Sequence, residues 1–489
     1  MPCSGKHFSA RGSLEEGGAS LTFFCFLWGA TELFHLFSFR VWARGDVGPL
    51  LLLAAIALLL RPSSLFRFSL MAGLDVLHVA ARSPMTANHI FFNGLVNLTI
   101  FLAVVQAFLR RGGQGIDRAA LFREFAAPVR VELLVLYFIT VLHKLNTDYL
   151  NPDISCGVHL LVAMHQRFPV LPVSEALKFF SIWGTLAVET AIPLFLCFPA
   201  TRMLGIFLGW SFHTFLAFYP HAGIISFSAM LFALYALFLP QEFLEHVWEA
   251  WLNPFAETLR QSAGWRFLKR RWAFCLAGAC LSGGMVLMWL KRGHSWLELY
   301  RLAAFFWNFV FLAHAILMMG LYASAYFFRR LRSPDEGRFF SLAFKSLWIM
   351  PLVVFLHSMS PYLGLKTVPC FSMFSNLRTE GAHPNHLFIP PALKIAHFQD
   401  DLVEVISSSN RELQGLADKK LLLPYFEFQR KLSLLRKPVK VEYLRAGKKF
   451  SLDNFGNKNK LVLPPVPWLL GKFLRFRPVD KEGPSLCRW

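Results

Sequence analysis

Charged residues are scarce in this sequence of 489 residues: Asp, Glu, Lys and Arg make up 16% of it, whereas hydrophobic residues make up 55%. A soluble protein of this length has too little interior to bury so much apolar surface. The composition therefore excludes a soluble globular class. It predicts an all-α polytopic membrane protein, a bundle of about 9–11 spanning helices with a small mixed extramembrane segment at the C-terminus.

Acidic residues are fewer than basic ones, 30 against 50, and the formal net charge is +20. In a soluble protein this excess would suggest nucleic acid as a partner. No basic stretch is interleaved with exposed aromatic residues, so we expect no nucleic-acid binding. In a membrane protein, basic residues gather in cytoplasmic loops and orient the spans.

The sequence signatures of soluble catalysis are missing: no Walker loop, GxSxG, HExxH or dinucleotide fingerprint occurs. The eight cysteines form no CxxC and no metal-ligand spacing, and most lie in apolar runs that favour a packing role. We therefore expect neither a metal nor a nucleotide cofactor. Glu15 and Glu16 precede the first apolar run, which argues against a cleaved signal peptide.

Apolar runs recur along residues 20–360, which we interpret as the transmembrane domain, between a tail at 1–19 and a segment at 361–489. A span needs about 20 residues, somewhat fewer in a tightly packed bundle. The predicted spans are 21–39, 46–60, 64–80, 90–108, 131–146, 179–198, 203–219, 222–239, 272–290, 302–327 and 342–360.

Basic residues in the loops predict the orientation of these spans. Alternate loops carry eighteen basic residues on one side and eight on the other. This bias places the N-terminus in the cytoplasm, and the 147–178 loop and the C-terminal segment on the outer side of the membrane. The C-terminal segment contains the strand-like VKVEYL and short apolar runs, so we expect it to be partly β and partly on the membrane surface. The alternative is a solvated tail.

A polar stripe marks the fourth predicted span. His89, Asn93 and Asn97 are spaced four residues apart and share one helix face, which must point into a bundle or cavity. For the two asparagines we favour hydrogen bonds between helices. For His89 a functional role and a structural role are equally supported, because histidine titrates near neutral pH.

Lys144 ends the fifth predicted span, directly after His143. A lysine at a span end commonly extends to the membrane interface. A functional role requires burial, because a desolvated lysine loses its charge and can accept a proton. The two side chains lie about 100° apart around a helix, so they cannot face the same partner.

Ionisable residues also occur inside later spans. Glu189 and His213 lie at similar depth in consecutive antiparallel spans, so we expect them to form a pair. Tyr219 and His221 close the outer end of the second of these spans. With the predicted orientation, His89 and Lys144 converge on the same outward side.

These segments occur in a characteristic order: NHIFFNGL, YFITVLHKLNTDYL, ETAIPLFL, then GWSFHTFLAF and FSAMLF. Together they resemble the HTTM family, the transmembrane domain of vitamin K-dependent gamma-carboxylase and its bacterial relatives. The resemblance covers residues 20–290. Residues 361–390 look like the segment that follows the last spans in one bacterial branch.

The resemblance implies a chemistry for the site. In the carboxylase, reduced vitamin K is deprotonated, reacts with O2 and becomes a strong base. That base removes the γ-proton of a glutamate, and CO2 adds to the carbanion. By resemblance, Lys144 would deprotonate the hydroquinone and His89 would stabilise the reacting carboxyl or carbanion. His213 matches a histidine of the same helix to which we assign no role. From their positions in the sequence, we take Asn93, Glu189, His213 and Tyr219 as binding or supporting residues of the same site.

The implied cofactor is a reduced quinone of vitamin K type, with O2 and CO2 as co-substrates, and membrane lipid is the expected surrounding partner. The family carries a pair of lysines where this chain has His143 and Lys144, and its large lumenal region has no counterpart here. Quinol chemistry is therefore better supported than carboxylation of a peptide glutamate, and the protein substrate is unknown. The alternative is a non-catalytic protein that binds a quinone, a lipid or a partner in the same pocket.

Overall fold

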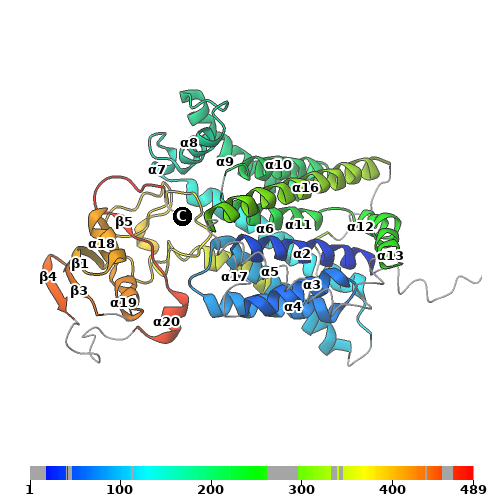
Figure 1. The fold of residues 1–489 in the computed structure, drawn as a ribbon, viewed down its shortest axis with the longest axis horizontal. Coiled ribbons are helices and arrows are strands. Elements are labelled where there is room, and N and C mark those ends of the chain that lie inside the picture. The colour runs from blue at the N-terminus through cyan, green and yellow to red at the C-terminus, as the bar shows by residue number, and fades with distance from the viewer. Residues whose placement is uncertain are drawn as a thin grey trace, which may run out of the picture.

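The computed structural model is mostly helical and carries a small β-sheet near the C-terminus (Figure 1). A bundle of long helices forms one part of the molecule, and the C-terminal region packs against one end of that bundle. The structure describes residues 18–39, 41, 47–111, 115–219, 221–261, 296–331, 339–340, 345–435, 438–453 and 466–487.

Long apolar helices build the bundle around one continuous core of buried aromatic and aliphatic side chains. Its helices are α2 (Ala19–Ser38), α3 (Gly48–Leu60), α4 (Leu65–Arg82), α5 (Asn88–Arg111), α6 (Arg118–Lys144), α9 (Glu175–Cys197), α10 (Arg202–Leu216), α11 (Ala222–Ala236), α16 (Trp296–Leu331) and α17 (Ile349–Ser358). Between α6 and α9 lie α7 (Thr147–Leu150) and α8 (Cys156–Arg167), and α11 is followed by α12 (Gln241–Val247) and α13 (Asn253–Gln261).

Each helix of the bundle overlaps a span that the sequence predicts, and the predicted span 272–290 lies outside the described residues. The largest difference is α6, which begins at Arg118 rather than at residue 131. The Asp117 side chain accepts a hydrogen bond from the backbone N–H of Ala120 at 3.1 Å, and this cap starts the helix early. Pro128 is accommodated inside the helix.

Among the described residues, five helices are long and apolar enough to cross a membrane, namely α2, α5, α6, α9 and α16. Residues 223–236 and 241–252 pass the same test together but are bent by 110° at their junction. Shorter apolar helices occur at Gly48–Leu60 and Lys345–Ser358. These helices are compatible with an integral membrane protein.

The C-terminal region has two parts. An irregular stretch follows α17 and includes the 3₁₀ turn η4 (Pro391–Leu393). An antiparallel sheet then forms in the order β4-β3-β1-β2-β5. Its strands are β1 (Leu402–Ser408), β2 (Leu421–Pro424), β3 (Lys440–Arg445), β4 (Lys448–Asp453) and β5 (Val479–Asp480), and its helices are α18 (Arg411–Asp418), α19 (Tyr425–Ser433) and α20 (Trp468–Phe473).

This region has an apolar core of its own, which includes the fully buried Val403, Leu423 and Val441. The prediction that VKVEYL forms a strand is confirmed by β3. The segment is folded, because alternating apolar residues close a separate core between the sheet and its helices. Its place on the membrane surface or in solvent stays a prediction.

Covalent and polar contacts join the C-terminal region to the bundle. Cys156 at the start of α8 and Cys487 form a disulfide bond across 331 residues of sequence. The Asn88 side-chain oxygen accepts hydrogen bonds from the backbone N–H groups of Cys370 and Phe371, each at 2.9 Å. For the two bonded cysteines the predicted packing role is wrong, because the sequence alone does not bring residues so far apart into contact.

Candidate functional site

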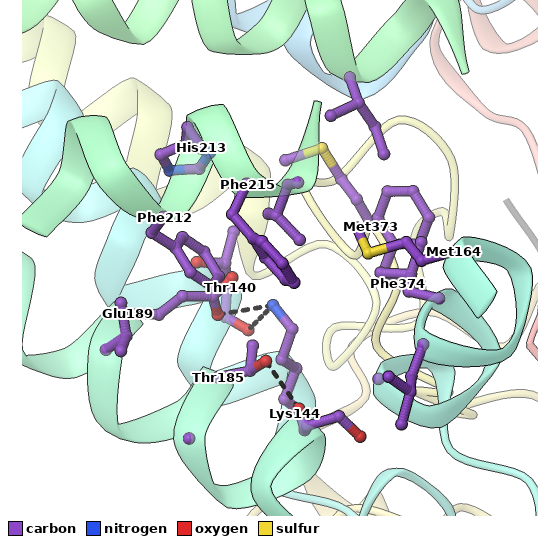
Figure 2. Close-up of a pocket in the computed structure, with 18 of the residues that line it drawn as sticks. Thr140, Lys144, Met164, Thr185, Glu189, Phe212, His213, Phe215, Met373 and Phe374 are labelled. Carbon is purple, nitrogen blue, oxygen red and sulfur yellow. Dashed lines mark hydrogen bonds and ion pairs between the residues drawn. The ribbon is translucent and has the colours of Figure 1, made fainter. Parts of the chain in front are cut away.

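A largely apolar cavity of about 240 Å³ lies where α6, α8, α9, α10 and α11 meet the segment after α17. Most of its lining is aliphatic or aromatic, and Figure 2 shows Phe212 and Phe215 on one side with Met373 and Phe374 on the other. Lys144 and Glu189 both line it, and their side chains point toward one another. An apolar cavity with a few convergent polar groups is the usual form of a small-molecule site.

Lys144 is the last residue of α6 and only 4% exposed. Its Nζ donates a hydrogen bond of 2.7 Å to Glu189 Oε2 and a longer one of 3.5 Å to the backbone carbonyl of Thr140. The side chain therefore turns back along its own helix into the protein. The interface position that is common for a lysine at a span end does not occur here.

Glu189 comes from the middle of α9, where it is 9% exposed. The predicted pairing of Glu189 with His213 is wrong, because the carboxylate instead accepts from Lys144. His213 Nε2 lies 2.7 Å from the hydroxyl oxygen of Tyr137, which also forms a short hydrogen bond with the Tyr235 hydroxyl. Lys144, Glu189 and His213 all line the cavity, but side-chain direction decided which of them are partners.

The Tyr137–Tyr235 pair was not predicted, because tyrosines in apolar runs resemble ordinary core residues. Their positions depend on a close approach at Gly209 of α10. A Cβ atom at Gly209 would lie 2.4 Å from the Tyr235 hydroxyl oxygen. Only glycine leaves room for this hydroxyl next to the helix backbone.

Gly157 plays a similar part where α8 packs on α9. A Cβ atom there would lie 2.8 Å from the backbone oxygen of Ser181 and 3.3 Å from the Tyr149 hydroxyl. The absence of a side chain lets α8 pack closely on α9, and Gly157, Ser181 and Tyr149 all line the cavity.

The segment after α17 supplies a wall of the cavity that the sequence did not assign to the site. Met373 and Phe374 line it. Two residues beyond Lys144, the Asn146 side chain donates hydrogen bonds to the carbonyls of His143 at 2.8 Å and Ser375 at 2.6 Å. This amide fixes the wall to the end of α6.

His143 faces away from the cavity, toward the C-terminal region. Its ring lies 5.5 Å from that of Tyr362, and it is absent from the lining of the cavity. This direction agrees with the predicted offset of about 100° between His143 and Lys144 around the helix.

His89 is buried but does not line the cavity. Its ring lies 5.9 Å from that of Phe227, and the other neighbours of Phe227 include His213 at 5.4 Å. Phe227 lines the cavity, so one aromatic ring stands between His89 and the site. The sequence predicted that His89 and Lys144 would converge on one site, but only Lys144 lines this cavity.

Asn93 and Asn97 hold neighbouring helices together, as expected for a polar stripe in a bundle. Asn93 donates to Glu32 at 3.1 Å and to Asp75 at 3.0 Å, and Asn97 donates to Asp75 at 2.6 Å. Trp28 in turn donates to the Asn97 carbonyl oxygen at 2.8 Å. This network joins α2, α4 and α5.

The two carboxylates of that network were not selected from the sequence. Glu32 and Asp75 are 1% and 0% exposed and lie inside the predicted spans 21–39 and 64–80. The rule that marks ionisable residues within spans would have found both of them. The same holds for Glu132 of α6, which accepts a hydrogen bond of 2.6 Å from the Thr99 hydroxyl.

Tyr219 and His221 lie after the end of α10 and stack on one another at 6.3 Å. The His221 ring accepts a hydrogen bond from the backbone N–H of Gly223 at 3.2 Å and so caps α11. Neither residue lines the cavity. Tyr219 therefore does not support the site directly, although the sequence predicted that it would.

Lys366 lies in the C-terminal region and is 1% exposed. Its ammonium packs over the rings of Phe473 at 4.3 Å and Phe91 at 5.2 Å. Burial lowers the pKa of this lysine to about 8. The residue joins α5 to α20 without an acidic partner in the described part of the chain.

Comparisons with known protein families, with curated proteins and with solved structures find no match for this chain. Among the residues that the structure describes, no group of three or more His, Cys, Asp and Glu side chains could hold a metal ion. The cavity and its polar groups are therefore the basis for assigning a function.

Proposed function

We propose that this chain is an integral membrane protein that binds a reduced quinone in the Lys144–Glu189 cavity and acts as a carboxylase-type enzyme. One observation carries the proposal: a buried lysine–glutamate pair at 2.7 Å lies in the wall of an otherwise apolar cavity. Burying two ionisable groups costs several kcal/mol, of order 20 kcal/mol per ion in the idealised limit. Such a pair in an apolar cavity is typical of a functional site.

The cavity fits the head group of a quinone. Its volume of about 240 Å³ lies at the small end for ligand sites, which suits one ring system better than a whole isoprenoid chain. Phe180, Phe212 and Phe215 supply aromatic contact for a flat ring. The Lys144 and Glu189 side chains provide a donor and an acceptor for its hydroxyl groups.

When bound, a reduced quinone supplies an acidic hydroxyl and, with O2, the strong base that carboxylation requires. The residues of the chain have simpler tasks. Glu189 Oε2 receives a proton from a ligand hydroxyl, and the Lys144 ammonium next to it balances the negative charge that remains on the ligand side. The pair thus acts as one unit, and this assigns to Glu189 part of the role that the resemblance gives to Lys144.

Hydrogen bonds join His213, Tyr137 and Tyr235 into one row of polar side chains beside the cavity. Tyr137 and His213 both line the cavity, and the Tyr137 hydroxyl bonds to His213 and to Tyr235. This row of side chains orients a second polar group of the ligand. His89, separated from the cavity by Phe227, acts on a co-substrate only indirectly, through packing.

The orientation is supported by the disulfide and by charge. Cys156 belongs to the 147–178 loop and Cys487 to the C-terminal segment, which the charge bias both places outside. Disulfides persist in oxidising compartments outside the cytoplasm. We therefore place these regions on the outer side of a bacterial inner or plasma membrane, the N-terminus in the cytoplasm, and about 9–11 spans between them.

The second candidate is a protein that binds a quinone or lipid without turnover. The apolar cavity supports it equally, because a hydrophobic ligand needs no reaction to be held there. The two functions differ in the fate of the bound ligand. The enzyme requires quinol-dependent oxygen uptake, whereas the binding protein requires none.

The test is oxygen uptake by the purified protein in detergent with a reduced short-chain naphthoquinone. We expect Lys144→Ala and Glu189→Gln to lower the rate by at least about a hundredfold, as for loss of a general acid–base group. Lys178 and Glu175 also form a pair at 2.7 Å, in the first turn of α9 where the glutamate is exposed, and neither lines the cavity. Lys178→Ala is therefore the matched control and should keep the wild-type rate. Full activity in Lys144→Ala would refute the catalytic assignment, and binding without uptake in the wild type would favour the second candidate.

A further inference from the structure

A second pocket, of about 400 Å³ and polar, lies outside the apolar cavity at the junction of the 147–178 loop and the C-terminal region. The polar side chains that line it include Asp148, Arg378, His383, Asn385 and His386. His383, Gly483 and Pro484 are exposed or at the rim, so the pocket opens at the surface. None of its lining residues belongs to the first cavity.

Arg378 is the unusual residue of this pocket. It is only 4% exposed, yet no carboxylate lies within ion-pair distance of it in the described part of the chain. Its Nε donates a long hydrogen bond of 3.4 Å to the backbone oxygen of Glu380, and its two terminal nitrogens donate none to the described residues. A buried guanidinium normally has a carboxylate partner, because an unpaired buried charge is costly.

The nearest acidic side chain in sequence is already paired elsewhere. The carboxylate of Glu380 accepts from Arg477 Nε at 3.3 Å and from the backbone N–H of Thr379 at 3.0 Å. Arg477 thus has the carboxylate partner that Arg378 lacks. Both arginines lie near Glu380, but only Arg477 forms an ion pair with its carboxylate.

Asp148 shares the pocket with Arg378 but has donors of its own. One oxygen accepts from the Asn385 amide at 2.7 Å and from the backbone N–H of Ser485 at 2.8 Å, and the other accepts from the Thr147 hydroxyl at 3.3 Å. The arrangement leaves Asp148 as a fixed structural anion. It does not neutralise Arg378.

His386 is also occupied. Its Nε2 bonds to the backbone carbonyl of Leu142 at 2.9 Å, and its Nδ1 accepts from the backbone N–H groups of Phe388 and Ile389. Burial lowers the pKa of His386, which keeps the ring neutral. Among the side chains that line the pocket, the terminal nitrogens of Arg378 and the exposed ring of His383 remain to donate to a ligand.

We infer that this pocket binds the carboxylate group of a small polar ligand, with Arg378 as its bidentate partner and His383 at the rim. Two parallel N–H···O bonds from one guanidinium match the two oxygens of a carboxylate. The carboxylate of the ligand would supply the negative charge that Arg378 lacks among the described residues. This inference does not depend on quinone chemistry in the first cavity.

The charge of the pocket favours a carboxylate over a phosphate. Asp148 contributes a negative charge to the same wall, and it makes no ion pair with Arg378 among the described residues. A phosphate dianion would meet this repulsion with twice the charge of a carboxylate. A ligand that also carries an ammonium group, such as a free amino acid, would find a partner for that group in Asp148.

The experiment uses the full chain, purified in detergent, and saturation-transfer NMR on the methyl protons of sodium acetate and the methylene protons of glycine, with inorganic phosphate added as a competitor at equal ionic strength. We expect saturable binding of acetate and of glycine, with acetate competing with glycine, and weaker competition by phosphate. Arg378→Gln should weaken acetate binding by roughly tenfold or more, the effect of losing about 1.4 kcal/mol. Arg378→Lys should retain part of it, because the charge remains without the bidentate fork.

The matched control is Arg445→Gln. Arg445 makes bidentate hydrogen bonds to Asp401 at 2.9 and 2.7 Å on the distant sheet, so its loss should leave acetate binding unchanged. Equal affinity for acetate in the wild type and in a folded Arg378→Gln variant would overturn the inference. So would tighter binding of phosphate than of acetate by the wild type, a measurement that needs no variant to fold.

Discussion

Lys144 Nζ and Glu189 Oε2 lie 2.7 Å apart in the wall of an apolar cavity, although 45 residues separate them in the sequence. The contact joins the end of α6 to the middle of α9. Each group is nearly buried, so each depends on the other for its hydrogen bond. Stability and function should therefore both respond to changes at either position.

The pair predicts strong coupling in a double-mutant cycle. Lys144→Met or Glu189→Leu alone leaves one buried ionisable group without its partner and should cost about 3–5 kcal/mol of unfolding free energy. The double variant replaces both by apolar side chains and should recover most of this loss. Denaturant unfolding in detergent measures the cycle, and additive single effects would show that the two groups do not interact.

Gly209 predicts a steric effect on the tyrosine–histidine chain. In Gly209→Ala the new Cβ would lie 2.4 Å from the Tyr235 hydroxyl oxygen, which is fully buried and must move. We expect a loss of about 1–3 kcal/mol of stability, typical of overpacking. Gly320 of α16 is the matched control, since a Cβ atom there meets nothing within 4 Å. Equal melting temperatures for the two alanine variants would contradict the packing at Gly209.

The disulfide predicts a covalent link between the 147–178 loop and the C-terminal region. Proteolysis without reductant, then mass spectrometry, should yield a cross-linked peptide that contains Cys156 and Cys487. Cys156→Ser should remove that peptide and lower stability by about 2–5 kcal/mol. Cys197→Ser should do neither, because Cys197 is a free thiol. Detection of both bonded cysteines as free thiols in unreduced protein would rule the bond out.

Lys366 predicts a dependence of stability on alkaline pH. Its pKa falls from the usual 10.5 to about 8 in the folded protein, so between these values the unfolded chain binds more protons than the folded one. Stability from this residue should therefore rise as the pH increases from about 8 to about 10.5, with no further change below the lower value.

Lys366→Met should remove that rise and stabilise the protein at neutral pH. Denaturant midpoints measured at about pH 7, 8, 9 and 10 would follow the change in stability across this range. Lys394→Met is the control variant in the same region, because Lys394 has an acidic partner, Asp400, at 2.5 Å. It should keep the rise in stability that Lys366→Met removes. An identical pH profile for the wild type and Lys366→Met would argue against a desolvated amine at this position.

Most of the bundle could be predicted from the sequence. Long apolar runs have few other ways to satisfy their backbone, so each of the ten bundle helices overlaps a predicted span, whereas α7, α8, α12 and α13 fall between the predicted spans. The alternating pattern of VKVEYL likewise predicted β3. The early start of α6 was not foreseen, because the capping residue Asp117 lies outside the apolar run on which the prediction rested.

The candidate site was predictable in part. An ionisable residue within or beside a span is costly, and this rule selected Lys144, Glu189 and His213, all of which line one cavity. It did not select Tyr137 or Met373, because neither departs from the composition of an ordinary core. The prediction also placed His89 too close to Lys144, since depth along a helix says nothing about which way a side chain faces.

The sequence by itself determined the helical class and the positions of the bundle helices, because both depend on local periodicity and on the cost of burial. Only the tertiary structure decided the partners: Lys144 with Glu189, Tyr137 with His213, Cys156 with Cys487, and no carboxylate for Arg378 among the described residues. Those choices depend on helix rotation and on contacts between segments far apart in the chain, which no local pattern encodes.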